Sequence, residues 1–423
     1  MRDDRMSLTA PPPAPGHAAA PAGGWKAILP LIASLCAISF MEYGATLSSI
    51  GLFLKPVQTE FGGSMAQASS IASVFMLASC ASSLVAGWLL DRLGAKSVVL
   101  AGCSASAIGL LVASRSGGMA GVFGGFALSG IGFGGATYVP TTAVLSRRLT
   151  SGLGTALGLT LAAAALGSAV LPMAMANLIL LAGWRTTCAG AAAGILVVTL
   201  PLVVAIIPAG AASHPRHSAL PGPARWTARE KRSLARACTA QFIFVAGYMG
   251  LYFHLMPCLA ERGFAPATVA AIFGAMNIVS TIGLAVIGIV ADRYGARRIL
   301  LVSMIANGLS VLLLAIDNPA YGWIALVSFV IAWGVTQGAP TQLIPVLVAT
   351  EVRTDKLGTA SGLIGLIQGL AGAAGPLLIG YLHDLSNGYG EPIAVAACLA
   401  LAATAPLLIG TAHRGSAKMP ETT

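Results

Sequence analysis

Glu42 is an acidic side chain in the middle of a long apolar stretch, and its type and place point to proton chemistry. It lies 16 residues after Lys26 and 13 residues before Lys55, or roughly 24 and 20 Å along a helix. A carboxyl group held that far from water is favoured in its neutral form, and an ionisable residue at such depth is a functional hypothesis by default. We expect Glu42 to bind and release a proton or to contact a substrate. The alternative is a neutral carboxyl group that only bonds a neighbouring helix.

A second titratable side chain, His254, stands three residues before Pro257 in another apolar stretch. Imidazole titrates in the pH range in which proton gradients act. We therefore expect His254 to carry protons or, alternatively, to bond a helix end near the membrane surface. Hydroxyl and amide groups at similar depth complete the expected binding site, although each alone can also serve to bond helices together. They belong to Tyr43, Tyr138, Tyr248, Tyr252, Asn277, Gln337 and Gln368.

The sequence offers no pattern for a metal site, a cofactor or an enzyme. Its seven cysteines stand singly, without a C-x-x-C pair or a histidine at ligand spacing, so we expect buried thiols and neither disulfides nor bound metal. It also lacks a Walker lysine motif, a G-x-S-x-G and an H-E-x-x-H, which mark nucleotide-binding and hydrolytic sites.

The elements that must position these side chains are membrane helices. Of the 423 residues, 56% are hydrophobic and 9% are charged, and the mean hydropathy is +0.83, whereas a soluble domain carries roughly 25% charged residues. Backbone groups in a bilayer must bond within their own segment, so the spans are expected to be helices. Twelve apolar stretches are long enough to cross, at 27–54, 68–90, 97–114, 119–145, 153–182, 187–208, 237–259, 267–290, 299–316, 321–349, 357–382 and 392–412.

The distribution of lysine and arginine predicts the orientation. Cytoplasmic segments of membrane proteins are enriched in these residues, and with both chain ends inside, 20 of the 24 fall inside and four outside. The net charge of +10 follows from this topology and does not indicate a nucleic-acid partner. The sequence thus predicts a cytoplasmic tail at 1–25, a six-helix bundle at 26–208, a cytoplasmic linker at 209–236, a second six-helix bundle at 237–412 and a cytoplasmic tail at 413–423.

Two ten-residue segments repeat each other between the second and third helix of each half. The segment 87–96 (GWLLDRLGAK) returns as 288–297 (GIVADRYGAR), 201 positions later. Further echoes in the fourth and tenth spans pair Gly134, Pro140 and Thr141 with Gly334, Pro340 and Thr341. Such a repeat predicts two halves of like topology around a central pathway, as alternating access requires.

The repeated G-x-x-x-D-R-x-G-x-K/R element resembles the signature loop of the major facilitator superfamily of secondary transporters. An aspartate at a helix junction, with cations and a tight glycine turn, can clamp neighbouring helix ends in one conformation and release them in another. The simpler alternative is a positively charged loop that only sets topology. The expected conformational switch comprises Gly87, Asp91, Arg92, Gly94 and Lys96 in the first half, and Gly288, Asp292, Arg293, Gly295 and Arg297 in the second.

Within that superfamily, several stretches are similar to the bacterial monocarboxylate-porter and oxalate/formate-antiporter branch: 49–64, 252–257 with 261–263, Arg147-Arg148 and Gly183-Trp184-Arg185. Where members of the branch that carry small carboxylates often have an arginine and some have an aspartate, this chain has Leu284 and Ser280, and the lysine of animal members aligns with Ser48. No lysine or arginine lies deep in any span, so helix dipoles and neutral donors would have to hold a carboxylate.

The resemblance implies a secondary transporter that moves a small organic anion of the monocarboxylate type by proton symport or exchange. We expect the protein to be a multi-pass monomer in a bacterial inner membrane. The expected partners of the protein are the lipid bilayer, a small-molecule substrate and protons or a counter-substrate. The apolar, arginine-poor cavity would also suit a proton-driven exporter of hydrophobic drug-like or natural-product compounds. A membrane sensor is a third class, which would be expected to carry an added soluble domain.

Overall fold

The computed structural model describes residues 24–148, 153–207, 226–316, 322–352 and 357–408, and the regular structure in them is helical. The first half holds α1 (Gly24–Ala45), η1 (Leu47–Ser49), α2 (Ile50–Phe61), α3 (Met65–Arg115), α4 (Met119–Ala136), α5 (Tyr138–Arg148) and α6 (Leu153–Ile206). The second half holds α7 (Ala228–Glu261), α8 (Pro266–Tyr294), α9 (Ala296–Leu312), η2 (Leu313–Ala315), α10 (Gly322–Thr336), α11 (Ala339–Glu351), α12 (Leu357–Ser386), α13 (Gly390–Ala402) and α14 (Ala405–Leu408). Most of the expected tails and linker, at 1–23, 208–225 and 409–423, lies outside the described residues.

Eleven helical stretches in the described ranges are long and apolar enough to cross a membrane. Ten of them coincide with ten of the predicted stretches. The other, Ala156–Ile206, has 51 residues and covers the two predicted stretches 153–182 and 187–208. One crossing needs about 20 residues, and the backbone leaves the helical conformation at Gly183, where φ is 80° and ψ is 164°. This long stretch therefore consists of two helical segments joined at a glycine.

Glycine also makes the turn inside each copy of the repeated element. The helical run of α3 is broken at Gly94 (φ 78°, ψ 161°), and α8 joins α9 at Gly295 (φ 93°, ψ 127°). A residue with a Cβ atom is rarely found at such angles. Because Gly94 and Gly295 hold the same place in the two copies, turn geometry accounts for this glycine of the element.

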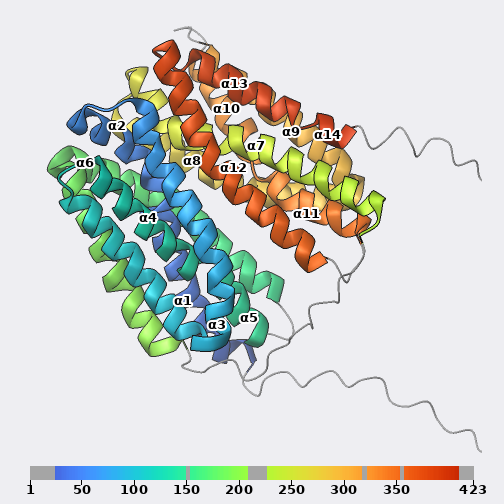
Figure 1. Cartoon of the computed structure of the whole chain (residues 1–423), viewed down its shortest axis with the longest axis horizontal. Helices are drawn as coiled ribbons and strands as arrows, with labels where there is room; N and C mark the ends of the chain where they lie inside the picture. Colours follow the sequence, from blue (N-terminus) through green and yellow to red (C-terminus); the bar gives the residue numbers. More distant parts are fainter. Residues whose placement is uncertain (1–23, 149–152, 208–225, 317–321, 353–356, 409–423) are drawn as a thin grey trace, which may run out of the picture.

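The two halves lie side by side as two bundles, with α1 to α6 in blue to green and α7 to α14 in yellow to red (Figure 1). They meet where α3 packs on α12 and where α6 packs on α8. Small residues allow the close approach: Gly369 of α12 faces Cys80 of α3, and Gly274 of α8 faces the backbone of Ala169 in α6. Within the first half, Gly44 of α1 and Gly167 of α6 bring two backbones into direct contact.

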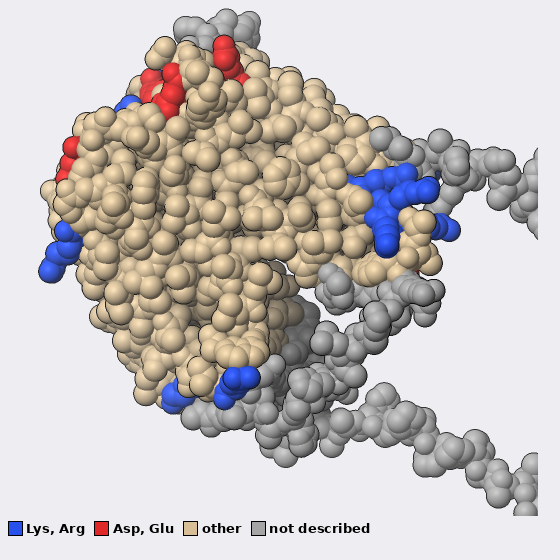
Figure 2. Space-filling model, in the orientation of Figure 1, with Lys and Arg blue, Asp and Glu red and all other residues tan. Residues whose placement is uncertain are grey.

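On the face that Figure 2 shows, the charged side chains lie toward the two ends of the bundles. We call one end the acidic end, because Glu60 ends α2, Glu261 ends α7 and Asp384 bonds the first turn of α3 there. The other is the cation-rich end, where Arg92 near the turn in α3 and Arg232 near the start of α7 are exposed. Figure 2 shows a hollow between the halves toward the cation-rich end, with lysines and arginines on both sides. Polar contacts join the halves at the acidic end, as described below. The interface is thus closed at the acidic end in this structure.

Candidate functional site

The fourth and tenth membrane stretches are interrupted at corresponding places in the two halves. Thr137 separates α4 from α5, with φ −100° and ψ −109°, and Gln337 with Gly338 separates α10 from α11. Thr137 and Gln337 stand 200 positions apart, inside the repeated pattern of glycine, proline and threonine. Interrupted helices at corresponding positions of two repeats are the best pointer to a binding site in such proteins.

A hollow of about 70 Å³ opens at the interruption in the first half. Its walls come from α1, the α4–α5 junction and α6, and they carry six hydroxyl and three apolar side chains: Ser39, Tyr43, Thr137, Tyr138, Thr141 and Thr160, with Leu157, Leu161 and Ala164. Thr137 and Thr160 donate to backbone carbonyls of their own helices. The Oγ1 atom of Thr141 is buried without a hydrogen-bond partner in the described part of the chain.

This arrangement suits a small polar group with acceptor oxygens. Hydroxyl groups both donate and accept, and the first turn of a helix, here that of α5, favours negative charge because its N–H groups point outward. The residues that form the wall include no charged side chain. The hollow therefore offers recognition by neutral donors, without an ion pair.

Polar and aromatic groups of the second half meet near Tyr252. The oxygens of Tyr252 and Ser48 are 3.0 Å apart, a hydrogen bond that joins α7 to the first half. Tyr252 also donates to Oδ1 of Asn277 at 3.4 Å. The Tyr248 ring lies 5.9 Å from that of Tyr252 and 5.3 Å from that of Trp333. Three of the predicted residues, Tyr248, Tyr252 and Asn277, are thus in one group.

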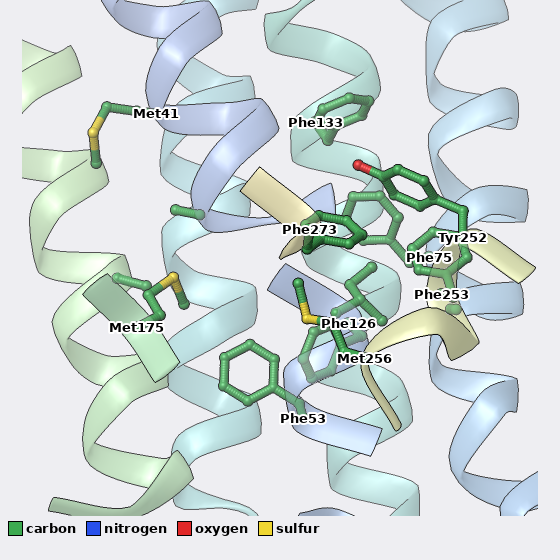
Figure 3. Packing of buried hydrophobic residues seen from close by; sticks show 14 of the residues in the cluster. Met41, Phe53, Phe75, Phe126, Phe133, Met175, Tyr252, Phe253, Met256 and Phe273 are labelled. Atoms are coloured by element: carbon green, nitrogen blue, oxygen red, sulfur yellow. The ribbon is translucent and has the colours of Figure 1, made fainter. Parts of the chain in front are cut away.

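Aromatic rings also pack on each side of the interface. In the second half, the Tyr252 ring lies 4.9 Å from that of Phe273. In the first half, Phe75 lies 5.5 Å from Phe133, which packs edge-on at 4.9 Å against Tyr43 in the wall of the hollow. All of these residues belong to one cluster of buried and partly buried side chains, part of which Figure 3 shows.

Glu42 is completely buried inside the first half. Ser106 of α3 donates to its Oε2 atom at 2.8 Å, and Cys103 lies close to the same carboxyl group. The Oε1 atom has no hydrogen-bond partner among the described residues. Although Glu42 precedes Tyr43 in the chain, its carboxyl group is directed toward α3 and does not form part of the wall of the hollow.

His254 is also completely buried, but it lies toward the acidic end. Its Nε2 atom is 2.8 Å from Oγ of Ser69 in α3 and 3.1 Å from the carbonyl of Pro376 in α12, and its Nδ1 atom is 2.9 Å from the hydroxyl of Tyr389. The structure therefore places His254 in the contact between the halves and away from the residues that line the hollow.

The two remaining predicted amides bond or face other helices. Gln368 of α12 accepts from Gln241 of α7 at the long distance of 3.5 Å, which is a contact within the second half. Gln337, at the interruption between α10 and α11, is 3% exposed, and its Oε1 atom has no hydrogen-bond partner among the described residues. Gln337 thus has an unpaired acceptor atom at the interruption, whereas Gln368 contacts α7.

The repeated elements lie at the cation-rich end. Lys96 donates to the carbonyl of Val204 at 2.6 Å, and Arg297 donates to the carbonyl of Leu407. Arg92 covers the ring of Trp88, 4.0 Å from its centroid.

The other residues of the repeated elements make fewer contacts. In the second copy Asp292 and Arg293 are exposed, whereas the side chain of Asp91 in the first copy lies outside the described part. Of the first glycines of the two copies, Gly87 has open space around it and Gly288 faces Gln342.

Sequence reasoning missed several small hydroxyl side chains, namely Ser39, Thr137, Thr141 and Thr160 in the hollow, Ser106 beside Glu42 and Ser69 beside His254. Such residues are common in membrane helices, where they bond the carbonyl one turn back, so their type alone does not single them out. Thr141 carried a usable signal, because it belongs to the repeated pattern that brackets the interrupted helices.

Known proteins resemble this chain along most of its length. The family model of the Major Facilitator Superfamily matches residues 31–376 and 237–418. Monocarboxylate transporter 13 of Rattus norvegicus is 27% identical over 400 residues, which are 92% of this chain and 89% of the relative. The bovine (Bos taurus) protein of that name is 27% identical over 278 residues, or 64% of this chain and 63% of the relative.

Solved structures show the same fold. The nucleoside transporter NupG superposes with a TM-score of 0.74 at 17% identity, over 89% of this chain and 99% of its own. A POT family transporter in complex with 5-aminolevulinic acid superposes with a TM-score of 0.72 at 13% identity, over 89% of this chain and 95% of its own.

Proposed function

Because this chain belongs to the Major Facilitator Superfamily, a family of transporters and not of enzymes, we propose that it moves a small organic anion of the monocarboxylate type by alternating access. Its similarity to monocarboxylate transporter 13 over 92% of the chain supports this substrate class. The driving force would be proton symport or exchange against a second anion. The pathway would open alternately at the acidic and cation-rich ends.

The proposed arrangement has twelve crossings, with Ala156–Ile206 crossing twice through the turn at Gly183. The bundles at 26–208 and 237–412 move against each other, and both tails and the linker at 209–236 are cytoplasmic. The excess of lysine and arginine at the cation-rich end supports this orientation. We assign the protein, as a monomer, to a bacterial inner membrane, following the sequence resemblance.

The observation that carries the substrate class is the hydroxyl-lined hollow at the interrupted helix. A carboxylate there would accept hydrogen bonds from Thr141 and its neighbours and would face the positive end of α5. Such a site requires no cation, in keeping with Leu284 and Ser48 at places where carboxylate carriers of the family have arginine and lysine. The apolar part of the substrate would lie along the rings of Phe133 and Tyr252.

Glu42 is the proposed proton carrier. Its carboxyl group is buried with a hydroxyl donor on one oxygen and no partner for the other in the described part, and a group in this environment is more stable when it holds a proton. Since Glu42 stands on α1 next to Tyr43, a change of charge at Glu42 would be felt at the wall of the hollow. This adjacency offers a route from protonation to substrate binding.

Export of hydrophobic compounds is the second candidate, and the uncharged wall of the hollow favours it. A lipophilic compound needs no ionic partner, and aromatic rings such as those of Tyr43 and Phe133, or of Tyr252 and Phe273, would bind it well. The two candidate functions therefore differ in the ligand that the protein should transport.

Counterflow in proteoliposomes separates them. The probes are radiolabelled monocarboxylates from acetate to valerate and, for the rival, a lipophilic fluorescent cation. We expect exchange of a monocarboxylate, and we expect Thr141→Val, which removes the hydroxyl but keeps the shape, to raise its KM roughly tenfold. Thr142→Val is the matched control, because the Thr142 hydroxyl bonds backbone carbonyls of its own helix. Pumping of the cation without monocarboxylate exchange would establish the second candidate.

A further inference from the structure

A group of polar side chains joins the two halves at the acidic end, and the proposed transport site makes no use of it. We call it the outer cluster. Its members are Ser69 of α3, Lys55 of α2, His254 and Glu261 of α7, His383 and Asp384 of α12, and Tyr389 at the start of α13. In the proposed orientation this end of the protein faces outward.

Asp384 caps a helix of the opposite half. Its two carboxylate oxygens accept from the backbone N–H groups of Met65 and Ala66, each at 2.8 Å. These are the first two residues of α3, and Ser64 satisfies the N–H group of Gln67. Negative charge is stabilised at a helix N-terminus. This contact therefore holds α12 against α3 only while the halves are together at this end.

His254 makes a second contact between the same halves, one turn deeper. Ser69 donates its hydroxyl hydrogen to the carbonyl of Met65, so it can only accept from Nε2 of His254. The carbonyl of Pro376, the other neighbour of Nε2, is also an acceptor. The network therefore assigns the ring hydrogen to Nε2, and Nδ1 accepts from the hydroxyl of Tyr389. This is the neutral form of histidine.

The remaining titratable groups connect His254 with the surface. The Tyr389 ring lies 4.6 Å from that of His383, whose Nε2 atom is 3.2 Å from the Glu261 carboxylate. Nδ1 of His383 lies 3.7 Å from Asp384, and Lys55 of the first half lies 3.6 Å from Glu261. Cys258 is the other titratable neighbour of Tyr389. Both carboxylates near His254 thus already have partners.

The closed interface accommodates neutral His254 better than charged His254. Its hydrogen-bond partners, Ser69, Pro376 and Tyr389, are all uncharged, and the side chain is 0% exposed. A buried charge without an ionic partner is costly. Separation of α3 from α7 and α12 would bring water to the ring, and an imidazole in water takes up a proton in the range of pH 5 to 8.

We propose that His254 is a proton-binding site that controls the outer gate, by which we mean the contact of α3 with α7 and α12 at the acidic end. The gate closes around the neutral imidazole and opens when His254 takes up an external proton. In the open state a proton from water binds Nδ1, which has left the Tyr389 hydroxyl, and the imidazole becomes a cation. The inference rests on the alternating access of the proposed function, and not on the identity of its substrate.

Linkage gives the size of the effect. A proton that binds the open state and not the closed state shifts the population toward the open state. For one imidazole with the usual affinity in water, the open fraction rises roughly tenfold from pH 7.5 to pH 5.5. Protonation of Asp384, which would remove an acceptor from α3, acts in the same direction at lower pH.

Hydrogen exchange of the backbone N–H groups at the start of α3 measures how often the outer gate is open. It needs no substrate, so its outcome is independent of the transport assay. The full chain is placed in nanodiscs of neutral lipid, and exchange of a peptide spanning residues 65–70 is followed by mass spectrometry, corrected for intrinsic pH dependence with an unfolded reference. We expect protection to fall roughly tenfold from pH 7.5 to pH 5.5, and His254→Gln to abolish this dependence.

Two further variants keep the test decisive. His383→Gln removes the other histidine of the outer cluster, which already has a carboxylate partner, and should leave the pH dependence intact. Ser69→Ala removes the contact but not the titrating ring, so protection should be lower at both pH values with the same relative change. Protection that is independent of pH in the unmodified chain would overturn the proposal, as would a full pH response in His254→Gln.

Discussion

Lys96 and Arg297 play the same structural part in the two halves. Each donates to a backbone carbonyl in the last turn of the helix that ends its half: Val204 in α6 for Lys96, and Leu407 in α14 for Arg297. Carbonyl groups at a helix C-terminus carry partial negative charge, which a cation stabilises. The last cation of each repeated element thus joins two helices within one half.

Replacing either cation should therefore loosen its own half. Lys96→Met and Arg297→Met keep the aliphatic stem but lose the donor, and each should cost about 0.3–1 kcal/mol, seen as a lower melting temperature in detergent. Arg298→Met, at an exposed position beside Arg297, is the control and should melt like the unmodified chain. Equal melting of all three variants would show that the two hydrogen bonds add nothing to stability.

The aspartates of the repeated elements should act on the conformational balance. We expect Asp91→Asn and Asp292→Asn to leave the protein folded and inserted but to slow transport, because loss of a contact made in one conformation alters the populations of both. Counterflow rates in proteoliposomes, normalised to inserted protein, measure this. Unchanged turnover in both variants would reduce the elements to topology signals.

The turn at Gly295 should be strained by any side chain, even though space is available. No atom lies within 4 Å of a Cβ placed at Gly295 or at Gly87, but only Gly295 has a positive φ, of 93°. Gly295→Ala should thus lose about 1–3 kcal/mol from backbone strain, whereas Gly87→Ala, inside α3, should be stabilising by about 0.5–1 kcal/mol. Thermal melting of the pair compares them. A stable Gly295→Ala variant would contradict the strain argument.

Glu42→Gln should separate exchange from accumulation. Glutamine keeps the shape and can accept from Ser106, but it fixes the neutral form. In proteoliposomes the variant should exchange substrate for substrate normally while losing uphill accumulation driven by an imposed pH gradient. Glu391→Gln, at an exposed acid in the first turn of α13, is the control.

The other outcomes for Glu42 are equally informative. Accumulation at the level of the unmodified chain would make Glu42 a structural residue and leave His254 as the leading proton carrier. Loss of both exchange and accumulation in a folded variant would instead place the substrate itself at Glu42, which would favour a cationic or donor-rich molecule over a carboxylate.

The orientation can be tested without transport. A reporter that is active only outside the cytoplasm, fused after Arg225 in the linker, should be inactive, because the distribution of lysines and arginines predicts that this segment is inside. The same reporter fused after Arg115, one of the four cations expected outside, should be active. A reversed pair of results would invert the proposed topology.

The sequence predicted the helical segments well, because each apolar stretch must satisfy its own backbone in the bilayer. It also predicted a glycine turn in each repeated element, which the structure has at Gly94 and Gly295. What it could not show is the direction in which a side chain projects from its helix. Glu42 and Tyr43 are neighbours in the chain, yet one carboxyl group bonds Ser106 and one ring borders the hollow.

The partners of buried groups were beyond sequence reasoning for the same reason. Nothing in the order of residues joins His254 to Ser69, 185 positions away, or Asp384 to the first turn of α3. These pairs form where helices of different halves cross, and the crossing depends on small residues such as Gly380, which faces Ser69 and Ala66. Gly380 gave no pattern of its own in a chain with 51 glycines.

The contact between Gly44 and Gly167 fixes the spacing of two walls of the hollow. Ser39 and Tyr43 stand on α1 and Ala164 on α6, close to the point where the two backbones touch. Neither helix can carry a side chain at that point without moving the other, so rotation of side chains cannot widen the gap. The width of the hollow is therefore set by two backbones. A ligand of the proposed site would have to be thin enough to fit this width before the hydroxyl groups of the wall could bind it.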